Sequence, residues 1–305
     1  MPKELLQAFV FPGQGVQRTG MGADLLFHEN PDIARSATRT YEEADDTLKL
    51  RIKKLSLYGE QERLNHPGLT EPVILTASIA ALRILRERGM QADVVAGHSL
   101  GEYSALVAAE ALSFEQALKL VRSRGLLMEQ AGKINPGKMG AILGNLTLED
   151  VERICRESGA EIANINAPDQ IVIAGRHESL DKAGEIVKKE KGKLVVLKVN
   201  VASHSSLMEP AREGMREMIK DEPISDPTLP IVMNLTADYA SDIGSIKREL
   251  VDQLTGRVLW LDTIRQIHRD GAGTFIDIGP GQVLANMIKK IEPSATTKTA
   301  EEIIR

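Results

Sequence analysis

The stretch "VVAGHSLGEYSAL", residues 94–106, decides the fold of the chain around it. An apolar run stops at Gly97, places His98 and Ser99 at a turn, and resumes as a helical pattern. Residues 97–101 match G-x-S-x-G between a buried strand and a helix, the context in which this motif exposes a serine above an α/β sheet. Both positions two residues from the serine are glycine, as a tight and strained turn requires. The stretch therefore predicts a nucleophilic serine.

Ser99 could also have a structural role, because serine is a frequent N-cap residue at the start of a helix. The pentapeptide favours the nucleophile, but it is a short pattern, and only the strand-turn-helix context adds weight to it. At a helix N-terminus, the backbone N–H of Leu100 can face an oxyanion that develops on an attacked carbonyl.

Strands alternate with helices along the chain. Short runs of small apolar and β-branched residues are separated by helical patterns, which is typical of a mostly parallel α/β sheet. The runs are "QAFVF", "ADVVAG", "KMGAIL", "IANIN", "QIVIAG", "KLVVLKV", "IVMN" and "TFIDIG". Together with the serine turn, this pattern predicts an α/β fold with an α/β-hydrolase-like core.

The middle third has an order of its own. Its pattern reads strand 138–143, helix 148–158, strands 161–165 and 170–174, helix 178–189 and strand 193–199, which is the βαββαβ order of a ferredoxin-like unit. The stretches "AGKINPGK" and "KVNVASH" flank it as natural crossings. We expect a small subdomain at 136–199 and a catalytic subdomain formed by 1–135 and 200–305, with a ligand cleft between them.

Composition excludes several classes of protein. The chain has 305 residues, 42% hydrophobic and 27% charged, with a formal net charge of -5. Without a basic patch, nucleic acid is not an expected partner. A single cysteine, Cys155, excludes internal disulfides and zinc-thiolate sites and fits a reducing compartment. We expect no apolar run to reach membrane-spanning length, so the sequence predicts a cytoplasmic protein without a membrane partner. It shows no metal-binding motif and no nucleotide-binding loop.

A serine nucleophile needs a general base. The chain has six histidines, and His204 is the candidate, because it follows a strand at the edge where open α/β sheets assemble their sites. Taken alone, a histidine in this position is more often a residue at the start of a helix than a general base. The remaining histidines are expected on solvated surfaces, apart from His98, whose side chain should point away from Ser99; the solvated set is His28, His66, His177 and His268.

Several motifs occur in register over nearly the whole chain. They are "FVFPGQGVQRTGMG", "GHSLGEYSALVAAEALSFEQALKLVRSRGLLME", "ANINAPDQIVIAG", "VASHSSLMEPA", "QLTGRVLW" and "FIDIGPGQVL". In order and approximate spacing, the chain resembles the malonyl-CoA:acyl carrier protein transacylases. The resemblance implies that Ser99 is acylated by malonyl-CoA and passes malonate to the phosphopantetheine thiol of an acyl carrier protein. Malonyl-CoA would then be a substrate, with no bound cofactor and no metal.

The same resemblance assigns the remaining roles. His204 matches the general base, and the main-chain carbonyl of Gln253 matches the group that orients it. The backbone N–H groups of Gln14 and Leu100 match the oxyanion hole. Arg124 matches the arginine that binds the malonyl carboxylate, for which a planar guanidinium is suited.

Each assignment has a plainer alternative. "PGQG" could be an ordinary turn, Arg124 an exposed helix arginine, and Gln253 a solvated amide at a helix end. Residues 257–260 read "RVLW" where the family usually has P-V-x-W, which puts Gln253 in doubt, and "VASH" puts strict malonyl selectivity in doubt. Asn166 could contact the pantetheine arm or be a turn residue.

Three functions compete at this point. The first is an acyltransferase that uses a thioester donor and a carrier-protein acceptor, in fatty acid, polyketide or malonate decarboxylase metabolism. The second is a serine thioesterase or hydrolase, if water reaches the acyl-enzyme. The third is a scaffolding subunit without turnover. Arg124 favours the first over the second, and the complete set of Ser99, His204 and flanking glycines argues against the third.

Overall fold

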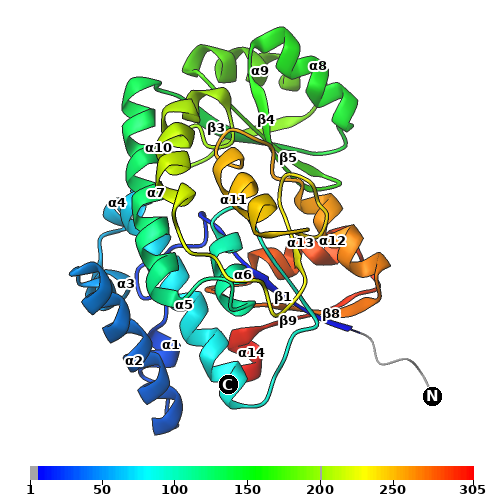
Figure 1. Ribbon diagram of the computed structural model, residues 1–305. Helices are drawn as coiled ribbons and strands as arrows, with labels where there is room; N and C mark the ends of the chain where they lie inside the picture. The colour runs from blue at the N-terminus through cyan, green and yellow to red at the C-terminus, as the bar shows by residue number, and fades with distance from the viewer. Residues whose placement is uncertain (1–5, 200) are drawn as a thin grey trace.

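The main body of the chain is built on a parallel sheet. The structure is a computed structural model, and it describes residues 6–199 and 201–305 (Figure 1). Five strands pair in the order β7-β2-β1-β8-β9, all in parallel. Their bounds are β1 Leu6–Phe11, β2 Val94–Gly97, β7 Ile231–Val232, β8 Ala272–Asp277 and β9 Thr296–Thr299. The predicted α/β class with a mostly parallel sheet is confirmed.

Helices cover both faces of this sheet. Along β1, Phe9 and Phe11 pack into the cluster that contains α5 and α7, whereas Ala8 and Val10 pack with α12 and α13 on the other face, as the two-residue period of a strand requires. The helices are α1 Ala23–Leu26, α2 Pro31–Leu48, α3 Ile52–Tyr58, α4 Gln61–Leu64, α5 Pro67–Glu87, α6 Gly101–Ala108, α7 Phe114–Ile134, α10 Glu209–Lys220, α11 Ile243–Asp252, α12 Trp260–Arg269, α13 Val283–Ile291 and α14 Ala300–Ile304, with a 3-10 turn at Ser206–Met208. The carboxyl ends of β1 and β2 therefore lie between two helical layers.

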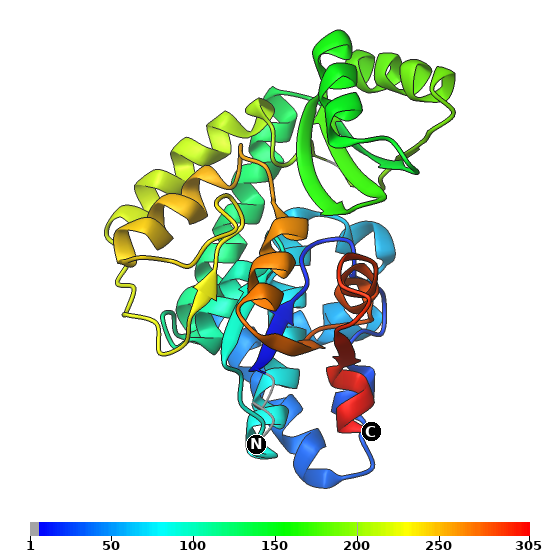
Figure 2. The ribbon, with the colours of Figure 1, turned by 90° about the vertical axis from the view of Figure 1, so that its right-hand side faces the viewer.

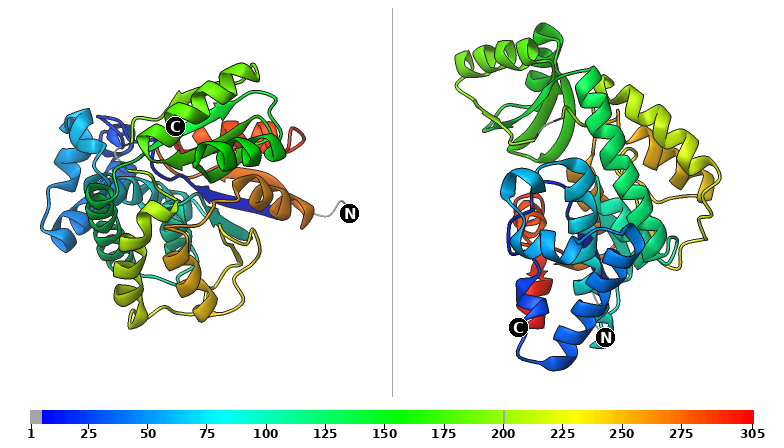
Figure 3. Two further views of the ribbon diagram at one scale, coloured as in Figure 1. Left: turned by 90° about the horizontal axis from the view of Figure 1, so that it is seen from above. Right: turned by 90° about the vertical axis from the view of Figure 1, so that its left-hand side faces the viewer.

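The middle third forms a second sheet. Its four strands pair antiparallel in the order β4-β5-β3-β6, with two helices on one face that share an apolar cluster with it. The elements are β3 Lys138–Leu143, α8 Leu148–Ser158, β4 Glu161–Ala167, β5 Gln170–Gly175, α9 His177–Lys189 and β6 Lys193–Val196. Figure 2 shows this unit beside the main body, and Figure 3 shows α7 leading up to it. Val258 joins the two parts through backbone hydrogen bonds with Ala163 and Ile165.

Three expectations need correction or completion. The last strand of the middle third ends at Val196 instead of Val199, and the expected boundary at Asn200 falls outside the described residues. The strand β9, of sequence "TTKT", was not predicted, because it is polar and lies at the edge of the sheet. Helix α5 is also long and apolar enough to cross a membrane, contrary to expectation, but 89% of its apolar window is buried inside the protein.

Candidate active site

The turn between β2 and α6 holds Ser99 in a left-handed backbone conformation, with φ of 52°. A side chain at Gly97 would put its Cβ 1.9 Å from the carbonyl carbon of Gly101, and one at Gly101 would meet the carbonyl oxygen of Phe11 at 2.0 Å. Both glycines are therefore required by close backbone packing. The Ser99 side chain makes no capping hydrogen bond to α6, for which Leu100 is the N-cap residue, so the N-cap alternative is wrong.

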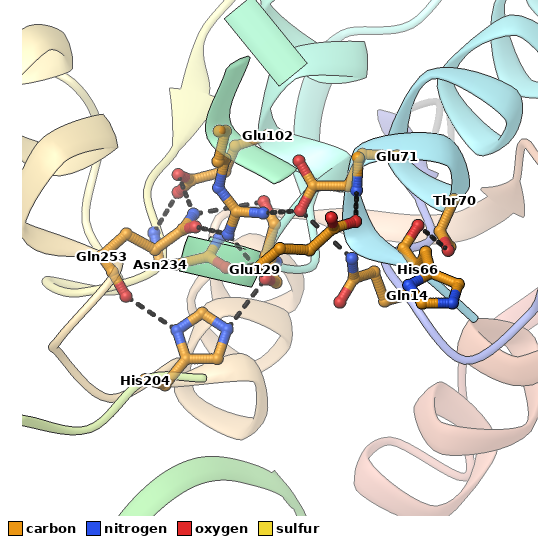
Figure 4. Close-up of polar contacts among 12 residues, drawn as sticks. Gln14, His66, Thr70, Glu71, Glu102, Glu129, His204, Asn234 and Gln253 are labelled. Atoms are coloured by element: carbon orange, nitrogen blue, oxygen red, sulfur yellow. Dashed lines mark hydrogen bonds and ion pairs between the residues drawn. The ribbon is translucent and has the colours of Figure 1, made fainter. Parts of the chain in front are cut away.

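Ser99, His204 and Gln253 form a hydrogen-bonded line (Figure 4). The Ser99 hydroxyl lies 2.8 Å from His204 Nε2, and His204 Nδ1 lies 2.7 Å from the main-chain carbonyl oxygen of Gln253. With Nδ1–H donating to that carbonyl, Nε2 is left as the acceptor that faces the hydroxyl. Gln253 is fully buried at the end of α11, so the solvated-amide alternative is wrong.

His204 is held neutral. Its side chain is buried, and its backbone, at φ of 60°, lies ahead of the 3-10 turn and not at a helix start. Burial and the nearby charge of Arg124 lower the pKa of His204 to about 3. At neutral pH the imidazole is therefore ready to accept a proton.

Arg124 reaches the serine from helix α7. Its side chain is 1% exposed, so the exposed-arginine alternative is wrong. Its Nη2 donates to the Ser99 hydroxyl oxygen at 3.3 Å and to Gln253 Oε1 at 2.9 Å. Its Nη1 forms an ion pair with Glu71 of α5, whose side chain is fully buried. A guanidinium thus lies beside the nucleophile.

Two backbone N–H groups near Ser99 are free to bind a ligand atom. Across the described residues, the N–H of Leu100 and that of Gln14 donate to no protein acceptor. The loop that carries Gln14 packs against the end of β2, where a Cβ at Gly13 would lie 2.4 Å from the carbonyl oxygen of His98. The geometry brings all six residues predicted for the site to one place: Gln14, Ser99, Leu100, Arg124, His204 and Gln253.

Sequence reasoning missed Asn234, which supports the serine turn. Its Oδ1 accepts the Ser99 backbone N–H at 2.7 Å, and its Nδ2 donates to the Gly97 carbonyl at 2.6 Å. Its own N–H donates to Glu102 of α6 at 2.6 Å. Asn234 ends the predicted strand "IVMN", and that position at the edge of a parallel sheet was the available signal.

Two buried carboxyl groups were also missed. Glu102 accepts from the Gln253 side chain, and burial together with Glu249 raises its pKa to about 8. Glu71 pairs with Arg124 and accepts from Gln14 Nε2 at 3.2 Å. Neither glutamate had a local signal, because each meets its partners only through the packing of separate helices.

The serine opens onto a cleft of about 300 Å³ between the two sheets. Loop 12–16 and His204 line it from the main body, and strands β3, β4 and β5 line it from the middle third. His98 and Asn166 also line the cleft, with His98 Nε2 2.8 Å from Asn166 Oδ1, and the His98 ring packs edge-on against Trp260 with ring centroids 5.4 Å apart. His98 thus points away from the hydroxyl, as predicted. Within residues 6–199 and 201–305, no group of three or more His, Cys, Asp or Glu side chains could hold a metal ion.

Comparisons with known proteins agree with this geometry. Residues 8–304 match the family described as the acyl transferase domain. The malonyl CoA-acyl carrier protein transacylase of Bacillus subtilis (strain 168) is 40% identical over 289 residues, which cover 93% of this chain and 90% of that protein. The enzyme of the same name from Haemophilus influenzae is 38% identical over 291 residues, 93% of this chain and 91% of its own.

Solved structures are similar over the same length. The acyl-carrier-protein S-malonyltransferase of Burkholderia pseudomallei 1710b superimposes with a TM-score of 0.92 at 38% identity, covering 98% of this chain and 99% of that one. A malonyl-transacylase solved in complex with its type II polyketide synthase acyl-carrier protein, in the holo form, gives a TM-score of 0.92 at 36% identity, covering 96% and 95% of the two chains.

Proposed function

This chain belongs to the acyl transferase domain family, and we propose on that premise that it moves a malonyl group from malonyl-CoA to the phosphopantetheine thiol of an acyl carrier protein. The observation that carries the proposal is the line Ser99–His204–Gln253 with Arg124 beside the hydroxyl. The similar proteins named for this reaction support it over nearly the full chain. The enzyme supplies malonyl units for fatty acid synthesis.

The proposed chemistry begins with attack on the thioester. The Ser99 oxygen bonds to the thioester carbon while His204 Nε2 takes the hydroxyl proton. The Gln253 carbonyl accepts the Nδ1–H and so stabilises the imidazolium that forms. Collapse breaks the carbon–sulfur bond, and the proton on Nε2 goes to the departing coenzyme A sulfur. The carrier-protein thiol reverses these steps.

Backbone donors would stabilise the charged intermediate. We assign the oxyanion hole to the N–H groups of Leu100 and Gln14, which have no protein acceptor among the described residues. One such donor is typically worth about 10²–10³ in rate. Arg124 would bind the malonyl carboxylate, since its guanidinium lies 3.3 Å from the serine oxygen and can reach a group two bonds beyond the acyl carbonyl.

We also propose the finer description of the fold. The order β3-α8-β4-β5-α9-β6 and the pairing β4-β5-β3-β6 support a ferredoxin-like subdomain at 136–199. The strand-turn-helix at Ser99 supports an α/β-hydrolase-like catalytic subdomain formed by 1–135 and 200–305. We further propose that the enzyme is cytoplasmic and works without a cofactor.

Covalent labelling tests the proposed function. Incubation with malonyl-CoA should add one malonyl group, and peptide mapping should place it on Ser99. Ser99→Ala should abolish the label. Ser104→Ala is the matched control, since Ser104 is a buried serine of α6, the helix that follows the Ser99 turn, and it should label as the wild type does. A label on any other residue would contradict the assignment.

A carrier protein of polyketide synthesis is a second candidate acceptor. The complex of a malonyl-transacylase with its type II polyketide synthase carrier protein, at 36% identity, favours testing it. Offering the malonyl-enzyme a holo carrier protein of each pathway distinguishes the two. Faster transfer to the fatty acid carrier protein supports the proposal, and faster transfer to the polyketide carrier protein favours the alternative.

A further inference from the structure

The guanidinium proposed to bind the substrate carboxylate already has a counterion. Arg124 Nη1 is paired with Glu71, and the two side chains are 1% and 0% exposed. Leaving a buried charge without its partner is strongly unfavourable, so Glu71 stabilises Arg124 in the empty site. Part of the guanidinium is still available, because its buried Nε has no partner among the described residues.

A carboxylate-bearing acyl group changes this balance. Once malonate lies on Arg124, two carboxylates face one guanidinium whose side chain is only 1% exposed. Like charges in such a site disfavour ionisation of both groups. The ionised form of Glu71 is only partly stabilised, because its Oε2 is buried without a hydrogen-bond partner in the described part of the chain.

We propose that Glu71 is the resting counterion of Arg124 and takes up a proton when a carboxylate-bearing acyl group binds. Preference for malonyl over acetyl groups therefore falls as the pH rises. The inference rests on the proposed function, which puts the substrate carboxylate on Arg124. Glu71 acts through Arg124 and is a specificity-determining residue, not a catalytic one.

The surroundings of Glu71 bring its pKa into the pH range in which the enzyme can be assayed. Burial raises the pKa of Glu71 to about 7, against the lowering effect of Arg124, and the charge of Glu129 on α7 raises it further. From α6, Tyr103 is the titratable neighbour, with its pKa raised to a value far above neutrality. The loop after β1 contributes only the neutral amide of Gln14.

The sign of the effect follows. Below about pH 7 Glu71 is already protonated in the empty site, so binding of a carboxylate takes up no further proton; above it Glu71 is the charged counterion, and binding must draw a proton from solvent. The pKa of His204, about 3, keeps the base neutral throughout this range, so the base contributes no change there. Acetyl groups carry no carboxylate, so protonation of Glu71 should not change how well they bind.

The first test compares kcat/KM for loading of malonyl-CoA and acetyl-CoA from about pH 6 to about pH 9. Their ratio cancels the titration of the coenzyme A portion. In the wild type it should fall above neutrality, by up to about tenfold per pH unit. In Glu71→Gln, whose amide keeps the size and an acceptor oxygen, the ratio should fall much less over this range and should exceed the wild-type ratio at high pH.

Glu129→Gln is the matched control. It removes one negative charge near Glu71, and its amide oxygen can still accept the Gly68 N–H that Glu129 accepts at 2.9 Å. This variant should keep a pH-dependent ratio, shifted slightly to lower pH. A wild-type ratio that does not change with pH, or an equal slope in Glu71→Gln, would overturn the inference.

A second measurement uses the wild type alone. Calorimetry of loading at about pH 8, in two buffers of different protonation enthalpy, counts the protons taken up. Uptake should be close to one proton greater with malonyl-CoA than with acetyl-CoA, and no difference would overturn the inference even if Glu71→Gln does not fold. If no malonyl adduct forms at any pH, the proposed function fails and the inference with it. If the adduct forms and the proton counts are equal, only the inference fails.

Discussion

The two sides of the Ser99 hydroxyl are built from different chemistry. On one side, here called the neutral side, the imidazole of His204 and the main-chain carbonyl of Gln253 carry no charge at rest. On the other, the charged side, Arg124 and Glu71 form an ion pair out of contact with water. Figure 4 shows His204 and Gln253 to one side of the cluster and Glu71 to the other.

This difference separates two tasks. Proton transfer to and from a serine is needed for every acyl group, and a neutral base held by a backbone carbonyl serves all of them alike. Choice among acyl groups needs a feature that only some of them match, and a buried guanidinium matches a carboxylate. Changes on the neutral side should therefore affect all donors equally, and changes on the charged side should affect them unequally.

The largest effect is expected on the neutral side. His204→Ala should lower kcat/KM by about 10²–10⁴-fold, the usual contribution of a general base. The loss should be of similar size for malonyl-CoA and acetyl-CoA. Measuring loading rates for both donors checks this, with His268→Ala as the control that keeps activity, because His268 is a half-buried histidine of α12 outside the site. A loss confined to malonyl-CoA would contradict the separation of tasks.

The lowered pKa of His204 also predicts how the loading rate depends on pH. Because the lowered pKa of His204 keeps the imidazole neutral above about pH 3, protonation of the base should not limit the rate in ordinary assays. The acetyl-CoA loading rate should thus show no fall between about pH 8 and about pH 5. An acid limb centred near the usual histidine pKa, about 6.5, would contradict this.

Arg124→Ala removes the guanidinium of the charged side and should lower malonyl loading selectively. Removing one member of a buried pair typically costs about 3–5 kcal/mol, which is about 150- to 5,000-fold in rate for malonyl-CoA. The acetyl group has no carboxylate that would be left without a partner, so loading of acetyl-CoA should be unchanged or improved. The preference for malonyl-CoA over acetyl-CoA should therefore be inverted. Arg124→Lys should rescue malonyl loading only in part, since a point charge lacks the bidentate geometry. Equal losses for both donors would make Arg124 structural.

The smallest effect is expected where the two sides meet. Gln253→Ala keeps the carbonyl that orients His204 but removes the side-chain contact to Arg124 Nη2 at 2.9 Å. Loss of such a charge-assisted hydrogen bond is worth about 1.5–3 kcal/mol. Malonyl loading should fall by about 10- to 150-fold, and acetyl loading by much less. A fall equal to that of His204→Ala would mean that the side chain also holds the base.

The sequence was most informative where structure is local. The helix 148–158 and the strand 138–143 agree with α8 and β3 to the residue, because caps, glycines and alternation mark them. The serine turn is likewise encoded within five residues. The edge strand β9 carries no such pattern, and its place depends on pairing with β8.

The same distinction between local and long-range information applies to the residues of the site. Ser99 follows from its own neighbours, and His204 from elimination, whereas Arg124 and Gln253 came from a resemblance. Glu71 was not identified at all, because its role exists only where α5 packs on α7. On the neutral side the residues themselves thus indicated His204, and on the charged side the role of Glu71 required the structure.

Transfer from the isolated malonyl-enzyme tests the central claim most directly. Enzyme loaded with malonyl-CoA and freed of excess donor should carry one malonyl group on Ser99 and hold it in buffer. Addition of a holo acyl carrier protein should move the group to the phosphopantetheine thiol, read by the intact masses of both proteins, while the apo carrier protein should leave it in place. Release of free malonate at the same rate with and without the holo carrier protein would instead identify a hydrolase and contradict the account.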